Sequence, residues 1–376
     1  MTFRRNAPAT IVIAISVVIA VSTFLSSRLF SGMTDAVEAD RFKIMQSIAE
    51  TALRDAENRA LGRAELIAAM PSVRRQFAAG DRAGLLAELS AAFAEQKARH
   101  GVDQAQFHIA PATSFLRLHD PKAFGDDLAV TRPMVVAANR ERQPLKGIAI
   151  ARNGPAIFGI AMMNDPAGKH VGSFEIGMSL APLLASIKSV YGMDLAFFVL
   201  EQPLREFAPA VDPARLGDQN RVGRYIRFET TNTELMTALA NADDVAVVNE
   251  PITYVREING LPHGVVVLPI NNAVGTTLGL LAISSDFSAS RAAVSVTLIW
   301  QAVLGLMGIL LLAGVVIVVI RGFLLRPLEV LGDRFDAVHT GAPLEDIPGV
   351  DHFPGEMEPF VRLYEKIRSR RKDAPK

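Results

Sequence analysis

Two stretches of the chain are long, apolar and free of charged residues, and they limit the possible folds more than any other feature. The first lies between Asn6 and Ser27, and the second between Ala292 and Ile320. A helix needs about 20 apolar residues to cross the hydrocarbon core of a bilayer. We therefore expect transmembrane helices at residues 9–28 and 292–320. For the first run a cleaved signal peptide is the alternative, although the run exceeds the usual apolar region of about 7–15 residues.

The arginines beside these runs predict how the chain is oriented. Arg4 and Arg5 precede the first run, and Arg321 and Arg326 follow the second. The positive-inside rule places both of these ends in the cytoplasm. We therefore expect a two-pass protein of the inner (plasma) membrane. Residues 1–8 and 321–376 are then cytoplasmic, and residues 29–291 form a periplasmic domain.

The overall charge and the absence of cysteine exclude several classes of function. The chain has 39 Lys and Arg against 39 Asp and Glu, so it offers no basic excess for binding nucleic acid. It has no cysteine, which excludes disulfides, iron–sulfur clusters and thiol nucleophiles. No Walker loop, GxGxxG, HExxH or EF-hand spacing is present. We expect no cofactor and no metal site.

The outer segment begins with a helical pattern and then changes to strands. Apolar residues recur at helical spacing over residues 31–69, with no proline before Pro71, so we expect a long helix that continues from the first span. A second helix is expected at 83–100. From Gln104 onward, short apolar runs separated by Gly, Pro, Asn and Asp indicate strands and turns. The expected strands are 106–109, 147–151, 156–162, 170–178 and 195–200, with helices at 132–140 and 180–191.

A second, smaller mixed unit follows. Strands are expected at 224–228, 245–249, 253–258, 264–270 and 276–284, with a short helix at 233–242. The pair Asn259-Gly260 is a hairpin signal. The expected fold class is therefore α+β, in two modules of about 71–200 and 201–290, flanked by the two membrane helices.

One block of sequence resembles a known family. It runs FHIAPATSFLRLHDPKAFGDDL from Phe107 to Leu128 and is followed by Arg132, PLKGIAI at 144–150 and GKHVGSFEIG at 168–177. This block resembles the double Cache sensory domain of bacterial chemoreceptors and sensor kinases, in the subgroup with a PATSFLR-type motif. The resemblance implies a long N-terminal helix along two PAS-like modules, with a small ligand in the membrane-distal one. Phe158 stands where members of the family tend to carry an arginine.

Beyond the second run, two stretches resemble a HAMP signalling linker. RPLEVLGDRFDAVHTG at 326–341 is similar to its first helix, and GEMEPFVRLYEKI at 355–367 is similar to its second. This resemblance implies a homodimer, because a HAMP unit is a parallel four-helix bundle from two chains. No output domain fits after residue 367, so we expect either a stand-alone sensor or, in the favoured interpretation, a separate signalling protein that supplies the output.

Several polar residues are candidates for contact with a ligand. Arg117, His119, Asp126, Asp127 and Arg132 lie within 16 residues of each other. Two arginines can clamp a carboxylate or phosphate, and the two aspartates can pair with an amine. A structural ion-pair network with a turn at residues 125–127 explains the same residues equally well. Phe115 is added as a pocket residue, and Glu175 as one that faces either the pocket or water.

Catalytic and metal sites find no support in the same region. His108 and His119 are separated by eleven positions, which matches no local ligand spacing, so we expect surface or capping histidines. No GxSxG elbow surrounds Ser114. We therefore expect no catalytic residue and no enzymatic activity.

Taken together, these features predict a membrane-bound bacterial sensor that binds a small extracytoplasmic ligand. A ligand acts in such a protein by binding one of two conformations more tightly than the other. The alternative is an envelope-anchored protein that binds or assembles other envelope proteins without sensing a small molecule.

Overall fold

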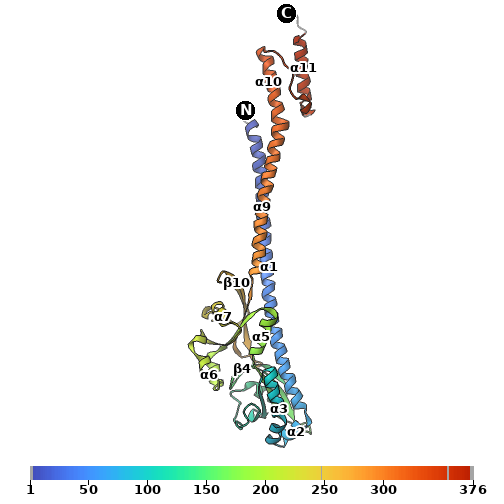
Figure 1. Ribbon diagram of the computed structural model, residues 1–376. Coiled ribbons are helices and arrows are strands. Elements are labelled where there is room, and N and C mark those ends of the chain that lie inside the picture. Colours follow the sequence, from blue (N-terminus) through green and yellow to red (C-terminus); the bar gives the residue numbers. More distant parts are fainter. Residues whose placement is uncertain (1–2, 247, 354, 373–376) are drawn as a thin grey trace. The chain divides into compact units, whose positions relative to one another are not determined.

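The computed structural model describes residues 3–246, 248–353 and 355–372. The chain divides into two compact units. One consists of Ala36–Ala289, and the other combines the residues up to Asp35 with those from Ser290 onward. The fold class is α+β, as expected from the sequence (Figure 1).

Three helices open the Ala36–Ala289 unit. The long helix α1 (Phe3–Ala69) ends at Ala69 because Pro71 disfavours helical backbone at Met70, and Pro71 then starts α2 (Pro71–Ala78). The third helix, α3 (Arg82–His100), is capped at its start by the Asp81 carboxylate, which accepts from Gly84 N at 2.8 Å. The helices expected at 31–69 and 83–100 are thus confirmed, whereas the sequence did not predict α2.

The first sheet has five antiparallel strands in the order β2-β1-β5-β4-β3. The strands are β1 (Val102–Ile109), β2 (Thr113–Arg117), β3 (Leu145–Ala151), β4 (Gly154–Asn164) and β5 (His170–Met178). Two helices belong to this module, α4 (Pro133–Glu141) and α5 (Ala181–Tyr191). All were expected except β2, which lies inside the PATSFLR block.

The two faces of this sheet are covered differently. One face is apolar, with Phe107, Leu116 and Phe174 in the same hydrophobic cluster as buried residues of α1, α2 and α3. On this side α1 approaches β4 without a gap, because a Cβ at Gly159 would lie 2.1 Å from the backbone nitrogen of Leu61. The other face carries α4.

The second sheet has six antiparallel strands in the order β7-β8-β6-β11-β10-β9. They are β6 (Asp194–Leu200), β7 (Arg221–Val222), β8 (Tyr225–Thr230), β9 (Ile252–Ile258), β10 (Leu261–Asn271) and β11 (Thr277–Asp286). Its helices are α6 (Glu201–Phe207), α7 (Thr233–Leu239) and α8 (Ala242–Val245). By strand pairing the second module thus begins with β6, ahead of residue 201. The Asn259-Gly260 hairpin is confirmed, with φ of 52° and 75°.

The strand expected at 245–249 is wrong. The described part of this stretch begins at the end of α8 and continues without strand pairing. Local capping decides the outcome, because the Asn241 side chain accepts from the backbone of Asp243 and Asp244 while the Asp244 carboxylate accepts from Asn241 N. This capping box starts a helical turn where the apolar pattern alone favours a strand.

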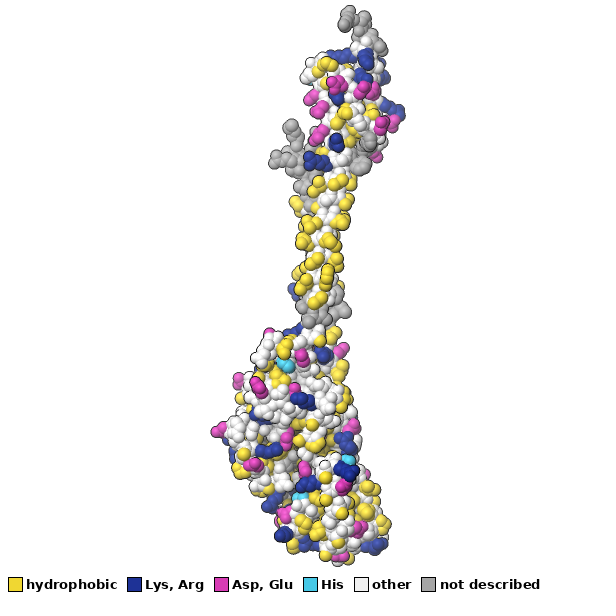
Figure 2. All heavy atoms as spheres, viewed as in Figure 1, with side chains coloured by type: hydrophobic (Ala, Val, Ile, Leu, Met, Phe, Trp, Pro, Cys, Tyr) yellow, Lys and Arg dark blue, Asp and Glu magenta, His cyan; other side chains and the backbone are white. Residues whose placement is uncertain are grey.

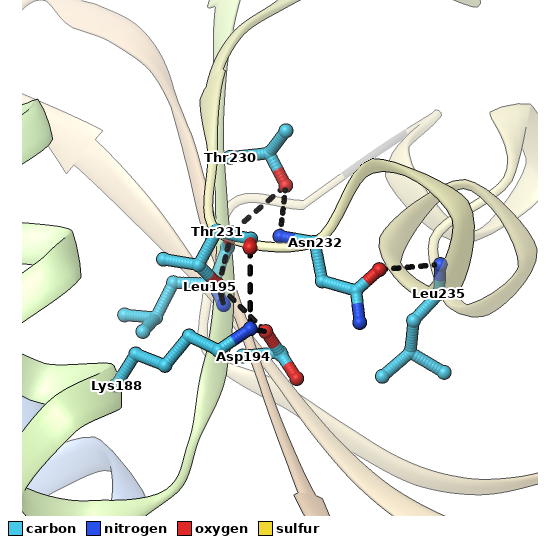
Figure 3. A network of polar contacts seen from close by, with 7 residues as sticks. All are labelled: Lys188, Asp194, Leu195, Thr230, Thr231, Asn232 and Leu235. Atoms are coloured by element: carbon cyan, nitrogen blue, oxygen red, sulfur yellow. Dashed lines mark hydrogen bonds and ion pairs between the residues drawn. The ribbon is translucent and has the colours of Figure 1, made fainter.

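A polar network ties α5 to the second sheet (Figure 3). Lys188 Nζ donates to the Asp194 carboxylate at 2.6 Å, and the Thr231 hydroxyl donates to the same oxygen at 2.8 Å. Leu195 N in turn donates to Thr231 Oγ1 at 2.9 Å. The end of β8 is thereby fixed against both α5 and β6.

The other unit contains apolar helical sequence. By length and composition alone, one described helix, Ile299–Thr340, is long and apolar enough to cross a membrane, while the apolar stretch Ile13–Leu29 is shorter. Figure 2 shows hydrophobic side chains gathered along these helices. Gln301 Nε2 donates to Ser26 Oγ at 2.8 Å, so the two stretches are in contact. The side chains of Arg4 and Arg5, on which the expected orientation depends, lie outside the described residues.

A small helical subdomain completes this unit. Helix α9 (Ser288–Val319) passes through a π-helical turn at Ile320–Leu325 into α10 (Arg326–Thr340). A second amphipathic helix, α11 (Glu358–Lys372), packs on α10 through a cluster that includes Leu331 and Tyr364. The two stretches that resemble a HAMP linker are therefore both helical.

Candidate ligand-binding site

Nine buried polar side chains gather on the α4 side of the first sheet. As whole residues none is more than 5 % exposed, although burying polar groups costs free energy unless they find partners. Most come from the paired strands β2, β1 and β5, and the remaining two from α4 and its N-cap. They are Gln104, Gln106, His108, Ser114, Arg117, Arg132, Asn139, Ser173 and Glu175. We call this set the polar cluster.

An ion pair between Arg132 and Glu175 lies within the polar cluster. Arg132 Nη2 donates to Glu175 Oε2, and the two side chains are 6 % and 1 % exposed. Burial raises the pKa of Glu175 above its ordinary value, although the positive charge of Arg132 acts in the opposite direction. The guanidinium also lies over the Phe158 ring, 4.4 Å from its centroid. Arg132 is thus held by a charge on one side and an aromatic ring on the other.

A second ion pair joins Arg117 to Asp126. Arg117 Nη1 and Nη2 donate to the two carboxylate oxygens at 2.9 and 2.7 Å, and Nη1 also donates to Ala123 O at 2.9 Å. The hydrogen bond from Arg117 lowers the pKa of Asp126 below its ordinary value. Both carboxylate oxygens are used, so this pair holds the loop of residues 118–131, which we call the β2–α4 loop.

Uncharged members of the polar cluster form a hydrogen-bonded chain. Asn139 Nδ2 donates to Ser173 Oγ at 3.0 Å, and Ser173 Oγ lies 3.3 Å from His108 Nδ1. Burial, followed by the charges of Arg132 and Arg117, holds the pKa of His108 well below its usual range, so the ring is neutral. We assign the Ser173 hydroxyl proton to Nδ1, which leaves the ring proton of His108 on Nε2.

Three buried polar atoms of the polar cluster have no hydrogen-bond partner among the described residues. They are His108 Nε2, Arg132 Nε and Asn139 Oδ1. With the proton assignment above, the first two are donors and the third is an acceptor. Buried polar atoms are almost always paired, with protein, water or ligand. The arrangement therefore suits a small molecule or ordered water with both acceptor and donor groups.

The remaining candidates from the sequence lie outside the polar cluster. Phe115 packs edge-on against Phe77 of α2, with ring centroids 5.2 Å apart, in contact with the apolar cluster. His119 places Nδ1 against the backbone of Ala105, and burial lowers the pKa of His119 to about 4. Asp127 is exposed and accepts from Ala129 N at 2.9 Å, so the side-chain turn lies at residues 127–129 and not at the expected 125–127.

Sequence reasoning misassigned His108 and left out several members of the polar cluster. His108 was expected at the surface or in a cap, but it is fully buried. Gln104, Gln106, Ser114, Asn139 and Ser173 were not among the candidates. A usable signal exists, because Gln104, Gln106 and His108 alternate with Ala105, Phe107 and Ile109. Such alternation indicates a strand with one polar face, and the structure buries that face.

A metal site finds no support in this geometry. Among the described residues, no group of three or more His, Asp or Glu side chains is placed to hold a metal ion. Glu175, the most buried carboxylate of the polar cluster, is already paired with Arg132.

Solved structures of bacterial sensory domains resemble this chain at low identity. The ligand-binding domain of Pseudomonas fluorescens chemoreceptor CtaA, in complex with L-serine, is 15 % identical with a TM-score of 0.36, over 67 % of this chain and 98 % of that one. The Pseudomonas aeruginosa amino acid chemoreceptor PctC, in complex with GABA, is 15 % identical with a TM-score of 0.36, over 67 % and 99 %. The sensor domain of the V. cholerae histidine kinase DctB is 9 % identical with a TM-score of 0.36, over 69 % and 98 %.

Sequence comparison assigns the family directly. No curated protein matches the chain. The profile of one family matches residues 40–290, and that family is described as the double sensory domain of two-component sensor kinases. The match covers both sheets and most of the Ala36–Ala289 unit. The chain therefore belongs to the double Cache family of sensory domains.

Proposed function

We propose that this protein is a membrane-bound sensor that binds a small polar ligand at the polar cluster. The observation that carries the proposal is the set of three unpartnered buried atoms, His108 Nε2, Arg132 Nε and Asn139 Oδ1. They lie in the module with α4, within a chain whose family is sensory. A ligand with two acceptor groups and one donor group satisfies all three.

The charges of the polar cluster favour a ligand without net charge. Arg132 and Glu175 balance each other, and Arg117 is balanced by Asp126 at the edge. A net charge brought into this buried place would lose its hydration without a free counter-charge. A zwitterion or a neutral polar molecule binds at a lower desolvation cost. Its acidic or acceptor group contacts Arg132, and its donor group contacts Glu175.

We further propose that α1 carries the signal. β4 and β5 pair along their length, and β4 contacts the backbone of α1 at Gly159 on the face opposite the polar cluster. A ligand that binds one arrangement of β5 more tightly therefore also favours one position of α1 on the sheet. The close contact at Gly159 leaves little room for the sheet to move independently of α1.

The proposed topology has two membrane spans and both termini in the cytoplasm of a bacterial inner membrane. Residues 9–28 and 292–320 are the proposed spans, and the double Cache unit is periplasmic. The helices α10 and α11 act as a HAMP-like linker in a homodimer. Reporter fusions at residue 150 and at the C-terminus test this topology. A periplasmic reporter must be active only at residue 150, and activity at the C-terminus contradicts the proposal.

Ligand binding is tested by a thermal-shift screen of the full chain in nanodiscs. The panel contains amino acids, organic acids, amines and purines. We expect at least one compound to raise the melting temperature of the wild type but not of the Arg132→Gln/Glu175→Gln variant. Arg140→Gln is the matched control, because Arg140 is exposed and, among the described residues, pairs only with its neighbour Glu141. No shift with any compound, or an equal shift in the double variant, opposes the proposal.

A further inference from the structure

A cavity lies at the seam between the two sheet modules, apart from the ion pairs of the polar cluster. Its volume is about 350 Å³. The first module contributes Lys97, Asp103 and Gln104, and the second contributes Arg215 and Glu229. Phe228 of the second module packs closely on Gly154 of the first, since a Cβ at Gly154 would lie 2.5 Å from the Phe228 ring. We call this space the seam cavity.

One wall of the seam cavity holds an amide without a partner among the described residues. Gln104 is only 5 % exposed, and its side chain makes no hydrogen bond with any residue that the structure describes. It lines the cavity together with Asp103. The register of β1 against β5 shifts between Val102 and Gln104, so Asp103 is the extra residue of a β-bulge. A bulge changes the direction in which the side chain of the extra residue points, and here that side chain is a carboxylate.

The seam cavity has a negative pole. Asp103 and Glu229 face it from the two modules. Burial raises the pKa of Asp103; the positive charge of Lys97 acts in the opposite direction, and the negative charge of Glu229 raises the pKa by a smaller amount. Glu229 is paired with Arg215 at 2.8 Å, whereas Asp103 forms no ion pair within 4 Å among the described residues. A cationic group placed near Asp103 therefore relieves an unfavourable charge.

A positive pole is supplied by Lys97. Lys97 is exposed toward the cavity and, in the described structure, pairs with no carboxylate. Ser179 and Leu180 at the start of α5 also line the cavity, but Ala181 N already donates to Ser179 Oγ at 3.3 Å and Pro182 has no N–H. An acidic group therefore fits beside Lys97.

We propose that the seam cavity is a second ligand site that binds a small zwitterion. Its ammonium group pairs with Asp103 and Glu229, its acidic group pairs with Lys97, and Gln104 supplies the remaining hydrogen bonds. Because the lining comes from both modules, the bound zwitterion joins them. This site modulates the sensor by fixing the first module against the second.

The position of Glu229 suits this role. It precedes Thr230 and Thr231, which the network of Figure 3 fastens to Leu195 and Asp194. Arg215 holds the Glu229 carboxylate at 2.8 Å and lies over the Phe228 ring at 4.9 Å from its centroid. The second module therefore presents a preorganised carboxylate to the seam, which lowers the entropic cost of binding.

The chain has no native cysteine, so a single engineered thiol can report on the seam cavity. The exposed lining residue Asn153 is replaced in the variant Asn153→Cys, and its alkylation rate is measured in the full chain in nanodiscs. The probes are glycine, β-alanine and γ-aminobutyrate, with n-butylamine and butyrate as single-charge comparisons. We expect at least one zwitterion to slow alkylation at millimolar concentration, while the single-charge compounds do not. The exposed variant Lys169→Cys controls for direct effects on the reagent.

Variants of the cavity lining distinguish binding in the seam cavity from binding at the polar cluster. Asp103→Asn and Lys97→Gln should each weaken the protection about tenfold or more, the factor for one hydrogen bond to a charged group. Asp55→Asn, which removes an exposed charge elsewhere, should not. Protection should persist in Arg132→Gln/Glu175→Gln, so failure of the polar cluster as a site leaves this test valid. The proposal is wrong if no zwitterion protects residue 153 up to about 10 mM, or if Asp103→Asn and Lys97→Gln leave the protection unchanged.

Discussion

Arg132 and Glu175 form an ion pair in the interior of the first module, although 43 positions separate them in the sequence. Arg132 is the N-cap of α4, and Glu175 lies on β5. The pair therefore fastens α4 to the sheet at the polar cluster. Each charge of the pair is neutralised mainly by the other. The pair therefore affects the free energy of unfolding directly.

Removing one member of this pair should be far more harmful than neutralising both. Glu175→Gln leaves the buried Arg132 without its counter-charge, and we expect a loss of about 3–5 kcal/mol in the free energy of unfolding. Arg132→Gln/Glu175→Gln keeps the packing and should lose much less. Urea unfolding of the Ala36–Ala289 unit within the full chain measures both. A double variant as unstable as the single variant contradicts this interpretation.

The Arg117–Asp126 pair should control the β2–α4 loop more than global stability. Asp126 is about half exposed, and solvent screens exposed pairs, so we expect Arg117→Ala to cost only about 1 kcal/mol. The amides of Gly125 and Leu128, which donate to Ser114 O and Ala112 O, should exchange hydrogen faster in this variant. Arg140→Ala should leave both exchange rates unchanged. Unchanged exchange in Arg117→Ala would show that other contacts hold the loop.

Stability should fall as the pH is lowered below neutrality, partly through His119. Its pKa is lowered from 6.5 to about 4, because burial disfavours the charged ring. At a pH between these two values, the unfolded chain binds a proton at His119 that the folded chain does not bind. This contribution is present above pH 6.5 and is lost as the pH falls toward about 4. In His119→Asn, the decrease in melting temperature between pH 7 and pH 5 should be smaller than in the wild type. An identical pH profile in both chains opposes the assignment.

The contact at Gly159 predicts a strong effect of a single methyl group. In Gly159→Ala the new Cβ meets the α1 backbone at Leu61 N, so α1 must move away from β4. We expect destabilisation of about 1–3 kcal/mol or more. Gly62→Ala is the control, because that Cβ meets nothing within 4 Å and alanine favours a helix. Equal melting temperatures of Gly159→Ala and the wild type would disprove the tight contact.

The regular elements were predictable wherever apolar periodicity was strong. β5 has the expected bounds, and α1 ends at Ala69, just before Pro71, as expected. The strand β2 was missed because Thr113 and Ser114 follow a proline and are typical of turns. Its strand character depends on pairing with β1. The stretch from Val245 was misjudged because side-chain capping by Asn241 outweighed the apolar pattern.

The candidate site was predictable only in part. The PATSFLR block and the sequence after it drew attention to Arg117 and Arg132, and both are buried in ion pairs. Their partners depend on tertiary structure: Glu175 reaches Arg132 because α4, whose N-cap is Arg132, packs against β5. The burial of His108 follows from α4 covering this face, which no local pattern specifies.

The central claim, that the polar cluster binds the ligand, is tested most directly by calorimetric titration of the most stabilising compound of the panel. Two chains are compared, one with Arg132 and Glu175 intact and one with Arg132→Gln/Glu175→Gln. Both carry Lys97→Gln so that the seam cavity is weakened. We predict one ligand per chain in the first and a loss of about 100-fold or more in affinity in the second. Equal affinity in the two chains would contradict the account.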